Sequence, residues 1–195
     1  MKIVLASNNA HKLKEMREIL ASTGIELISQ REAGADFEAE ENGLTFEENA
    51  RIKATACMRA TGLPSLSDDS GICIDALAGL PGIYSSRFLG ELSYPEKCRR
   101  IIRLLEDYPV RTARYACSVV LVFPDGREYT AFGTTEGAVA RDQAGEGGFG
   151  YDPMFIVEGD GRHMAELSED EKNAISHRGR AVRALLKTLK ENGIC

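Results

Sequence analysis

Two adjacent carboxylates, Asp68 and Asp69, lie in the sequence S-D-D-S-G at 67–71. Short apolar runs at 63–66 and 72–74 flank them, so we expect two strands with these charges at the mouth of a sheet. Neighbouring carboxylates repel each other, and a cation is a natural partner for such a pair. The same residue types also favour a solvated turn. This stretch alone therefore leaves a turn and a metal or general-base site as alternatives.

The stretch S-N-N-A-H-K at 7–12 is a candidate anion site between an expected strand and an expected helix over residues 10–21. Asn8 and Asn9 are good helix caps. Free N–H groups and the positive dipole end of a helix attract anions, and Lys12 adds a charge one turn into the helix. The sequence lacks the G-x-x-x-x-G-K-[ST] pattern of the usual phosphate-binding loop. A plain helix cap with a surface lysine is the alternative.

An acidic segment at 32–42 is expected to be a solvated loop, one carboxylate of which can reach a metal. A helix should then begin at Thr45, whose spacing to a glutamate is that of a capping box, and end at Gly62. Asn49 and Lys53 lie one turn apart on this helix. Either side chain can face a pocket, but from this helix alone we expect both to face solvent. A second capping box at Ser93 should begin another helix.

The sequence G-E-G-G-F-G at 145–150 formally matches a dinucleotide-binding pattern. That interpretation fails because a strand at 154–157, and no helix, follows it. The glycines instead allow the backbone to approach a ligand closely, with Phe149 or Tyr151 available to stack on a planar ring. A flexible turn is the alternative.

Basic residues gather before the expected C-terminal helix. Lys172 follows a third capping box that begins at Ser168, and His177 and Arg178 come directly before the final helix. A histidine in this position is usually a cap or a surface residue. Together with its two basic neighbours, His177 can instead belong to a basic ligand site.

Composition and charge limit the possible functions. The chain has 195 residues, 43% hydrophobic and 28% charged, and a net charge of −6, which argues against general binding to nucleic acid or to an anionic membrane. Its five cysteines are odd in number and lack C-x-x-C spacing, which indicates reduced thiols in a cytoplasm. No apolar run approaches the length of a signal peptide or a membrane span.

The order of expected elements predicts an α/β protein. Helices interleave with strands, and a hairpin formed by 114–123 and 127–133 makes the sheet mixed. On its first strand, alternate residues from Tyr115 to Phe123 should share one face. A further strand near 136–140 should extend this antiparallel region.

Six stretches, taken in this order, closely resemble the inosine triphosphate pyrophosphatase family, and the resemblance runs nearly end to end. They are S-N-N-A-H-K at 7–12, E-E-N-G-L-T-F-E-E-N-A at 40–50, S-D-D-S-G at 67–71, G-L-P-G-I-Y-S-S-R at 79–87, G-G-F-G-Y-D-P-M-F at 147–155 and E-K-N-A-I-S-H-R at 171–178. Enzymes of that family hydrolyse the non-standard purine nucleotides ITP, dITP and XTP to the monophosphate and pyrophosphate, which cleanses the nucleotide pool.

The resemblance implies roles for individual residues. Asp69 matches the catalytic proton acceptor, and it matches a magnesium ligand together with Glu40, although Glu41 is adjacent. Arg178 matches a base contact, where its donors suit the 6-oxygen of hypoxanthine or xanthine. The matching substrate-binding positions are Ser7, Asn8, Asn9, Ala10, His11, Lys12, Lys53, Ser70, Phe149, Gly150, Tyr151, Asp152, Lys172, His177 and Arg178.

The resemblance also implies one domain over residues 1–195, an elongated unit with two lobes around a central mixed sheet and the active site in the cleft between them. It implies Mg²⁺ as cofactor and a cytoplasmic homodimer that binds a purine nucleoside triphosphate, with no nucleic-acid polymer or membrane as partner. Two other functions stay open: a pyrophosphatase for other nucleotides, such as thymidine or uridine triphosphates, and a non-catalytic nucleotide-binding regulator. The paired carboxylates favour catalysis, because a pure sensor does not need a metal–carboxylate centre.

Overall fold

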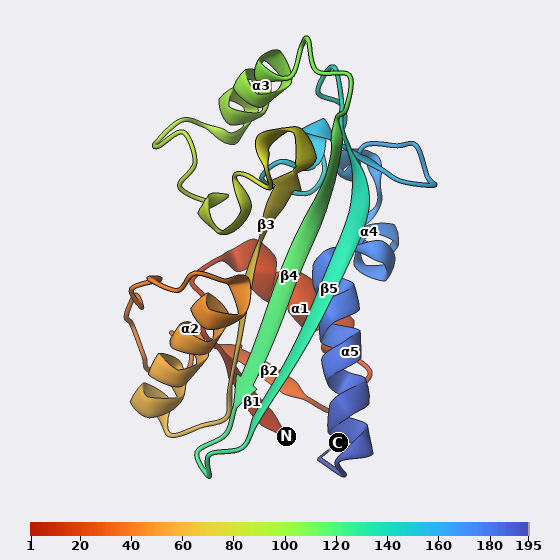
Figure 1. Ribbon diagram of the computed structural model, residues 1–195. Coiled ribbons are helices and arrows are strands. Elements are labelled where there is room, and N and C mark those ends of the chain that lie inside the picture. Colours follow the sequence, from red (N-terminus) through yellow and green to blue (C-terminus); the bar gives the residue numbers. More distant parts are fainter. Residues whose placement is uncertain (195) are drawn as a thin grey trace. The chain divides into compact units, whose positions relative to one another are not determined.

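The computed structural model describes residues 1–194, and over this range the chain forms a six-stranded sheet with helices, as Figure 1 shows. The strand order is β2-β1-β3-β4-β5-β6; β1 pairs in parallel with both β2 and β3, whereas β5 and β6 are antiparallel. The expected α/β class with a mixed sheet is therefore confirmed. The strands are β1 Lys2–Leu5, β2 Glu26–Ser29, β3 Ser65–Ile74, β4 Thr112–Val122, β5 Glu128–Val139 and β6 Phe155–Val157. The α-helices are α1 Ala10–Leu20, α2 Phe46–Thr61, α3 Tyr94–Leu104, α4 Glu169–Ile175 and α5 His177–Glu191.

The described chain divides into two compact units. Unit 1 contains residues 1–69, 117–133 and the segment from 178 onward, and unit 2 contains residues 70–116 and 134–177. Each of the strands β3, β4 and β5 contributes residues to both units. No helix among the described residues is both long and apolar enough to cross a membrane.

Unit 1 packs helices against both faces of its strands. Along β4, Cys117, Val119 and Leu121 belong to the same core as the buried residues of α1 and α5, as the alternation predicted. The residues between them are buried too, because Val120 and Val122 pack against α2. Two covered faces explain why residues 119–122 of this strand are all apolar.

Helices α1 and α2 of unit 1 begin at the residues expected from the sequence. Asn9 caps α1, and its side-chain oxygen accepts hydrogen bonds from the main-chain N–H groups of His11 and Lys12 at 2.9 and 3.2 Å. Thr45 caps α2, and Gly62 ends it in the left-handed conformation that glycine adopts without strain.

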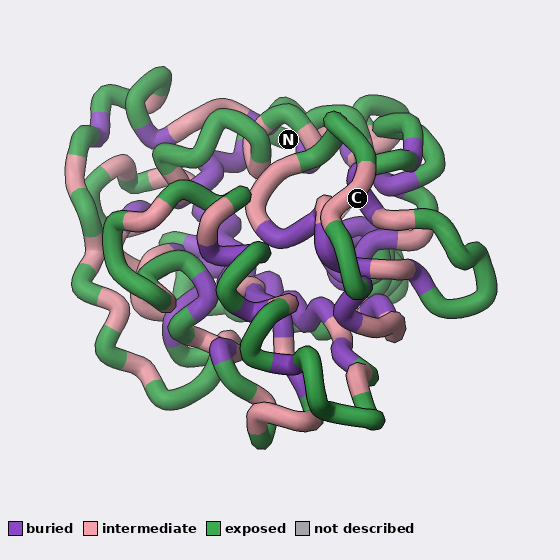
Figure 2. The backbone as a smooth tube through the Cα atoms, turned by 90° about the horizontal axis from the view of Figure 1, so that it is seen from above, coloured by how far each residue is buried: buried purple, intermediate pink, exposed green. Residues whose placement is uncertain are grey.

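Unit 2 has its own apolar core. Ile72 and Ile74 of β3 pack with the inner side of α3, with Phe155 of β6 and with further residues of β4 and β5. Figure 2 shows the same pattern of burial, with buried segments in the interior and exposed turns at the periphery. At the start of α3, however, the expected capping box of Ser93 is absent, since its side chain makes no capping hydrogen bond.

Two expectations about strands were wrong. Residues 65–74 form the single strand β3, so Asp68 and Asp69 lie within a strand and not at a mouth between two. Residues 128–139 likewise form one strand, β5, where two were expected. Hydrogen bonds to neighbouring strands hold such polar stretches extended, and sequence periodicity does not reveal this.

Gly71 of β3 is predicted to be intolerant of a side chain. A Cβ atom there would lie 2.2 Å from the Gly82 carbonyl oxygen and 2.3 Å from the Ser85 hydroxyl, which itself accepts a hydrogen bond from the Ile72 N–H. Gly71→Ala should lower the free energy of unfolding by about 1–3 kcal/mol. Urea denaturation would measure this, with Cys73→Ala on the same strand as control; equal stability of the two variants would contradict the steric argument.

Candidate active site

Asp68 is a buried carboxylate surrounded by cations of unit 1. Its Oδ2 atom accepts hydrogen bonds from Nε and Nη2 of Arg178 at 3.2 and 3.0 Å, and lies 3.0 Å from Nζ of Lys12. The exposed fractions of the Asp68 and Arg178 side chains are 0% and 1%. A second carboxylate, Glu15 of α1, accepts a hydrogen bond from Nη1 of Arg178. Asp68 therefore joins β3 to the first turns of α1 and α5.

The charges around Asp68 keep it ionised. Burial by itself would raise the pKa of this carboxyl group, but the positive charges of Lys12, Arg178 and Lys53 outweigh it and hold the pKa well below its ordinary value. Burial likewise lowers the pKa of Arg178, yet the charges of Asp68 and Glu15 raise it overall. Both partners thus stay charged at any working pH.

Asp69 lies in a second set of contacts. Its Oδ1 atom is 3.0 Å from Nζ of Lys53, and Oδ2 accepts a hydrogen bond from Nδ2 of Asn49 at 3.3 Å. The Lys53 ammonium also lies 3.0 Å from Oε1 of Glu41. Asn49 and Lys53 therefore face this site and not solvent, which agrees with the position that the resemblance implied for Lys53, because α2 packs against the sheet with the side that carries them.

The two neighbouring aspartates have pKa values shifted in opposite directions. Burial raises the pKa of Asp69, and the positive charges of Lys53 and Lys12 reduce this effect without cancelling it. For Lys53, burial lowers the pKa, but the charges of Asp69, Asp68 and Glu41 raise it above its ordinary value. Opposite shifts in a pair of carboxylates separate a permanent anion from a potential proton acceptor. Here Asp68 is the permanent anion, and Asp69 is the carboxylate with the raised pKa.

The structure brings Glu41, and not Glu40, beside Asp69. Within residues 1–194, no side chain forms an ion pair with the exposed Glu40 carboxylate, and no cluster of three or more His, Cys, Asp or Glu residues is arranged to hold a metal. Two carboxylates that converge on one ammonium are nevertheless oxygen donors of the kind Mg²⁺ prefers. Metal binding by Asp69 stays a prediction, and the geometry favours Glu41 over Glu40 as its partner.

The turn at 7–12 combines a helix cap with a buried lysine. Ser7 accepts a hydrogen bond from the Asn9 N–H at 3.1 Å, and the Asn8 side-chain oxygen accepts one from Gln30 at 3.0 Å. The remaining predicted positions here, Ala10 and His11, are exposed in the first turn of α1. Lys12 is not a surface lysine, since its side chain is only 16% exposed and pairs with Asp68.

Unit 2 holds a separate polar cluster built on the glycine-rich segment. Nζ of Lys172 lies 2.8 Å from Oδ2 of Asp152, and both side chains are buried. The same Asp152 oxygen accepts a hydrogen bond from the Phe149 N–H at 2.8 Å, and the Lys172 ammonium lies 4.6 Å from the centre of the Phe149 ring. Lys172 therefore fixes the segment that carries Phe149, a half-buried ring suited to stacking on a base.

Tyr151 differs from Phe149, because it is part of the core. Its hydroxyl donates to the Ser85 carbonyl at 2.8 Å, and its ring packs edge-on against Tyr94 at 5.3 Å. Tyr151 is therefore not available to stack on a ligand ring. Gly150, beside it, takes a positive φ of 70°, and Ser70 is half-buried on β3.

His177 and Arg178 do not precede the final helix as expected; they are its first two residues. The imidazole of His177 is buried and stacks on the ring of Tyr115, with centroids 4.7 Å apart and planes 11° apart. Three guanidinium nitrogens of Arg178 donate to the carboxylates of Asp68 and Glu15. A base contact by Arg178 stays a prediction, and this geometry gives the residue another task, the neutralisation of Asp68.

Sequence reasoning missed Glu15, Tyr115 and the part that Asp68 plays. Glu15 lies one helical turn after Lys12, a spacing that places both on one side of α1. This spacing was the available signal for Glu15. For Tyr115 no local signal exists, because its partner His177 is distant in sequence.

Fold and site together define an α/β protein whose third strand carries two neighbouring aspartates with pKa values shifted in opposite directions. The chain matches the Ham1 family model over residues 3–188. It is 44% identical over 194 residues to a dITP/XTP pyrophosphatase of Shigella flexneri, covering 97% of this chain and 98% of the relative. The chain belongs to the Ham1 family.

Solved structures agree with this assignment. A HAM1 protein from Coxiella burnetii superimposes with a TM-score of 0.89 at 43% identity, covering 98% of this chain and 99% of the other. A nucleoside-triphosphatase / dITP/XTP pyrophosphatase from Mycobacterium abscessus gives a TM-score of 0.76 at 42% identity, with coverage of 95% and 99%.

Removal of the Asp68 charge is predicted to destabilise the protein strongly. Asp68→Asn removes the counter-ion of Lys12 and leaves the buried Arg178 with Glu15 alone, which should cost about 3–5 kcal/mol in free energy of unfolding. The folded-state pKa of Asp68 is lowered, so the ionised carboxylate contributes to the free energy of unfolding. This contribution is complete above the unfolded-state pKa of about 4 and is lost as the pH falls towards the folded-state pKa.

The difference in free energy of unfolding between the wild type and Asp68→Asn should therefore be largest near neutral pH and shrink as the pH falls below about 4. Chemical denaturation at a series of pH values would measure it, with the exposed Asp107→Asn as control. A deficit that is small, or constant over this pH range, would show that Asp68 is not the anchor of the cluster.

Proposed function

We propose that the protein is a nucleoside triphosphate pyrophosphatase that hydrolyses ITP, dITP and XTP to the monophosphate and pyrophosphate. The main support for this proposal is the pair of neighbouring aspartates whose pKa values are shifted in opposite directions. Asp69, which lies beside Lys53, is the one whose pKa is raised. The names of relatives that match nearly the whole chain, dITP/XTP pyrophosphatases, support the substrate class.

Asp69 would orient the attacking water and accept its proton. A carboxylate with a raised pKa is a stronger base, and burial makes Asp69 such a group. Its contacts with Asn49 and Lys53 hold the carboxylate in one orientation. Lys53 and Lys12 would offset part of the negative charge of the triphosphate.

Asp69 and Glu41 are the residues that would hold Mg²⁺. Both carboxylates already face one cationic group, the Lys53 ammonium, and one or two carboxylates with phosphate oxygens suffice for this ion. When bound, the ion would stabilise charge on the phosphates as the bond between the α- and β-phosphates breaks.

We propose that residues of unit 2 recognise the purine base of the substrate. Phe149 supplies a ring for stacking, and Lys172 with Asp152 fixes the segment that carries it. A donor to the 6-oxygen of hypoxanthine or xanthine would be left facing the amino group of adenine, at a cost of roughly 1–3 kcal/mol. Arg178 suits this task less well than predicted, because its guanidinium is engaged by two carboxylates.

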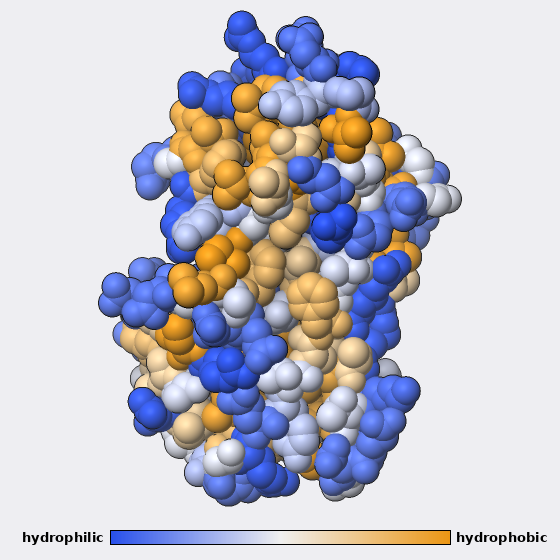
Figure 3. All heavy atoms as spheres, in the orientation of Figure 1, coloured by the Kyte–Doolittle hydropathy of each residue, from blue (hydrophilic) through white to orange (hydrophobic). Residues whose placement is uncertain are grey.

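We further propose a cytoplasmic homodimer. The buried free thiols of Cys57, Cys98 and Cys117, whose pKa values burial raises, support a reducing compartment. Apolar side chains are exposed on unit 2, among them Leu80, Tyr84, Leu89 and Leu104, and Figure 3 shows apolar surface over the part of the molecule that holds α3. Such exposed apolar surface supports association with a second copy.

Product analysis tests the proposed activity. With Mg²⁺ and a panel of XTP, ITP, dITP, dTTP, GTP and ATP, we expect pyrophosphate as the first product and the fastest turnover with the first three. Asp69→Asn should reduce this turnover at least about 100-fold, because it removes the proton acceptor. Orthophosphate as first product, or equal rates with ATP and ITP, would contradict the proposal.

The choice between Glu41 and Glu40 is tested by two matched variants. Glu41→Gln should increase the Mg²⁺ concentration needed for half-maximal activity by about tenfold or more, because a ligand with negative charge is lost. Glu40→Gln, which makes the same chemical change one residue away, should leave it nearly unchanged. The reverse result would assign the metal to Glu40, as the sequence predicted.

A further inference from the structure

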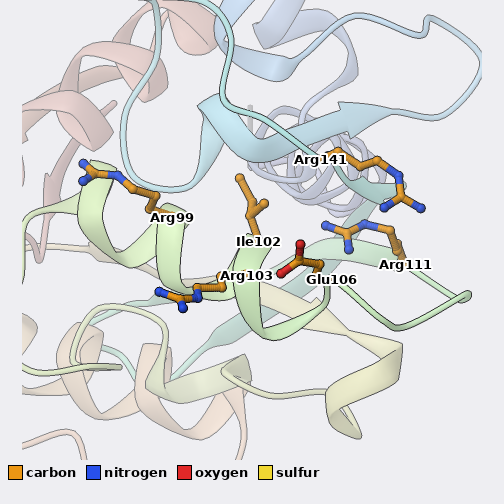
Figure 4. A pocket seen from close by; sticks show the side chains of 6 residues that line it. All are labelled: Arg99, Ile102, Arg103, Glu106, Arg111 and Arg141. Carbon is orange, nitrogen blue, oxygen red and sulfur yellow. The ribbon is translucent and has the colours of Figure 1, made fainter.

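Unit 2 contains a hollow of about 420 Å³ beside α3. Its lining consists of four arginines, one glutamate and one isoleucine: Arg99, Ile102, Arg103, Glu106, Arg111 and Arg141 (Figure 4). They come from the second half of α3, from the segment before β4 and from the segment after β5. The hollow shares no residue with the candidate active site, and the proposed function does not use it.

Two of these arginines already have hydrogen-bond or ion-pair partners within the protein. Arg111 is structural, since its guanidinium donates to the carbonyl oxygens of Val139 at 2.9 Å, of Ala140 at 2.6 Å and of Leu105. Arg99 pairs with Glu96 on the exposed side of α3 at 3.0 Å.

Arg103 and Arg141 are different. Throughout the described part of the chain, residues 1–194, no carboxylate forms an ion pair with either of them. Both are exposed, and both line the hollow.

The positive charge here is not balanced locally. The lining groups carry a net charge of +3, although the whole chain carries −6. Burial lowers the pKa of the Arg111 guanidinium, and repulsion by Arg141 lowers it further. Figure 4 shows these two side chains next to each other, which agrees with that repulsion. An anion bound between them would relieve it.

We propose that this hollow binds a small anion with two or more phosphoryl groups. Guanidinium groups present planar forks of donors that match phosphate oxygens, and charge-assisted hydrogen bonds of this kind are among the stronger ones in proteins. The volume lies in the range of small-ligand sites. The arginines come from α3 on one side and from the segments next to β4 and β5 on the other, and the guanidinium groups of Arg99 and Arg103 point away from those of Arg111 and Arg141 (Figure 4), so an anion with several phosphoryl groups would be needed to contact both sides.

Calorimetric titration with inorganic tripolyphosphate, in EDTA to exclude metals, tests the proposal. The double variant Arg103→Ala/Arg141→Ala should bind at least about tenfold more weakly at this site than the wild type, because two charged donors are lost. Arg59→Ala, an exposed helical arginine of α2, is the matched control and should bind normally. All three positions are exposed, so the variants are expected to fold, which thermal unfolding would verify.

The candidate active site also attracts phosphates, and Lys53→Ala separates the two sites. Binding at the arginine-lined hollow should persist in Lys53→Ala, whereas the double variant should keep its catalytic rate. A failed pyrophosphatase assay would leave this titration unaffected, so the two proposals fail independently. If the double variant binds tripolyphosphate as tightly as Arg59→Ala in a Lys53→Ala background, the hollow is not an anion site.

A second titration identifies the source of the phosphoryl groups. Equal affinity for tripolyphosphate and for ATP would assign the hollow to the phosphate chain alone, and tighter binding of ATP would assign it to a nucleotide. Both affinities should fall as the ionic strength increases, because the contacts are made at an exposed surface.

Discussion

The site depends on the pairing of buried Asp68 with Arg178 and Lys12. An unpaired charge in the interior is very costly, so a carboxylate with no exposed side-chain surface requires cations beside it. The two cations come from the first turns of α5 and α1, which are far apart in sequence. The ion pairs therefore set the position of both helices against β3 within unit 1. Glu15 completes the network by sharing the second side of the Arg178 guanidinium.

This arrangement also gives the next residue its chemical character. Asp68 forms ion pairs with Arg178 and Lys12. Its neighbour Asp69 forms an ion pair with Lys53, and Lys53 also pairs with Glu41. Burial then dominates at Asp69 and makes it the more basic of the pair. Two identical side chains, adjacent on one strand, thereby acquire pKa values that are shifted in opposite directions.

Unit 2 uses the same principle at its own polar cluster. The buried pair of Lys172 and Asp152 holds the glycine-rich segment, and the Asp152 carboxylate binds the Phe149 N–H directly. At Gly148 a Cβ atom would lie 2.2 Å from that carboxylate, so glycine is required for the close approach. A buried ion pair thus fixes the backbone, and the backbone presents an aromatic ring.

Local patterns in the sequence determined the elements, and the family resemblance supplied most of the candidate site residues. Caps at Asn9 and Thr45, the glycine stop at Gly62 and the alternation along β4 depend on neighbours within a few residues, so they could be read directly. Only the tertiary structure decided that Asp68 and Asp69 lie within one strand. It decided that the guanidinium group of Arg178 donates its hydrogen bonds to carboxylates. It also decided that Glu41 and not Glu40 approaches Asp69. The physical reason is that burial and charge pairing arise between segments distant in sequence, and these interactions fix the pKa and the availability of each group.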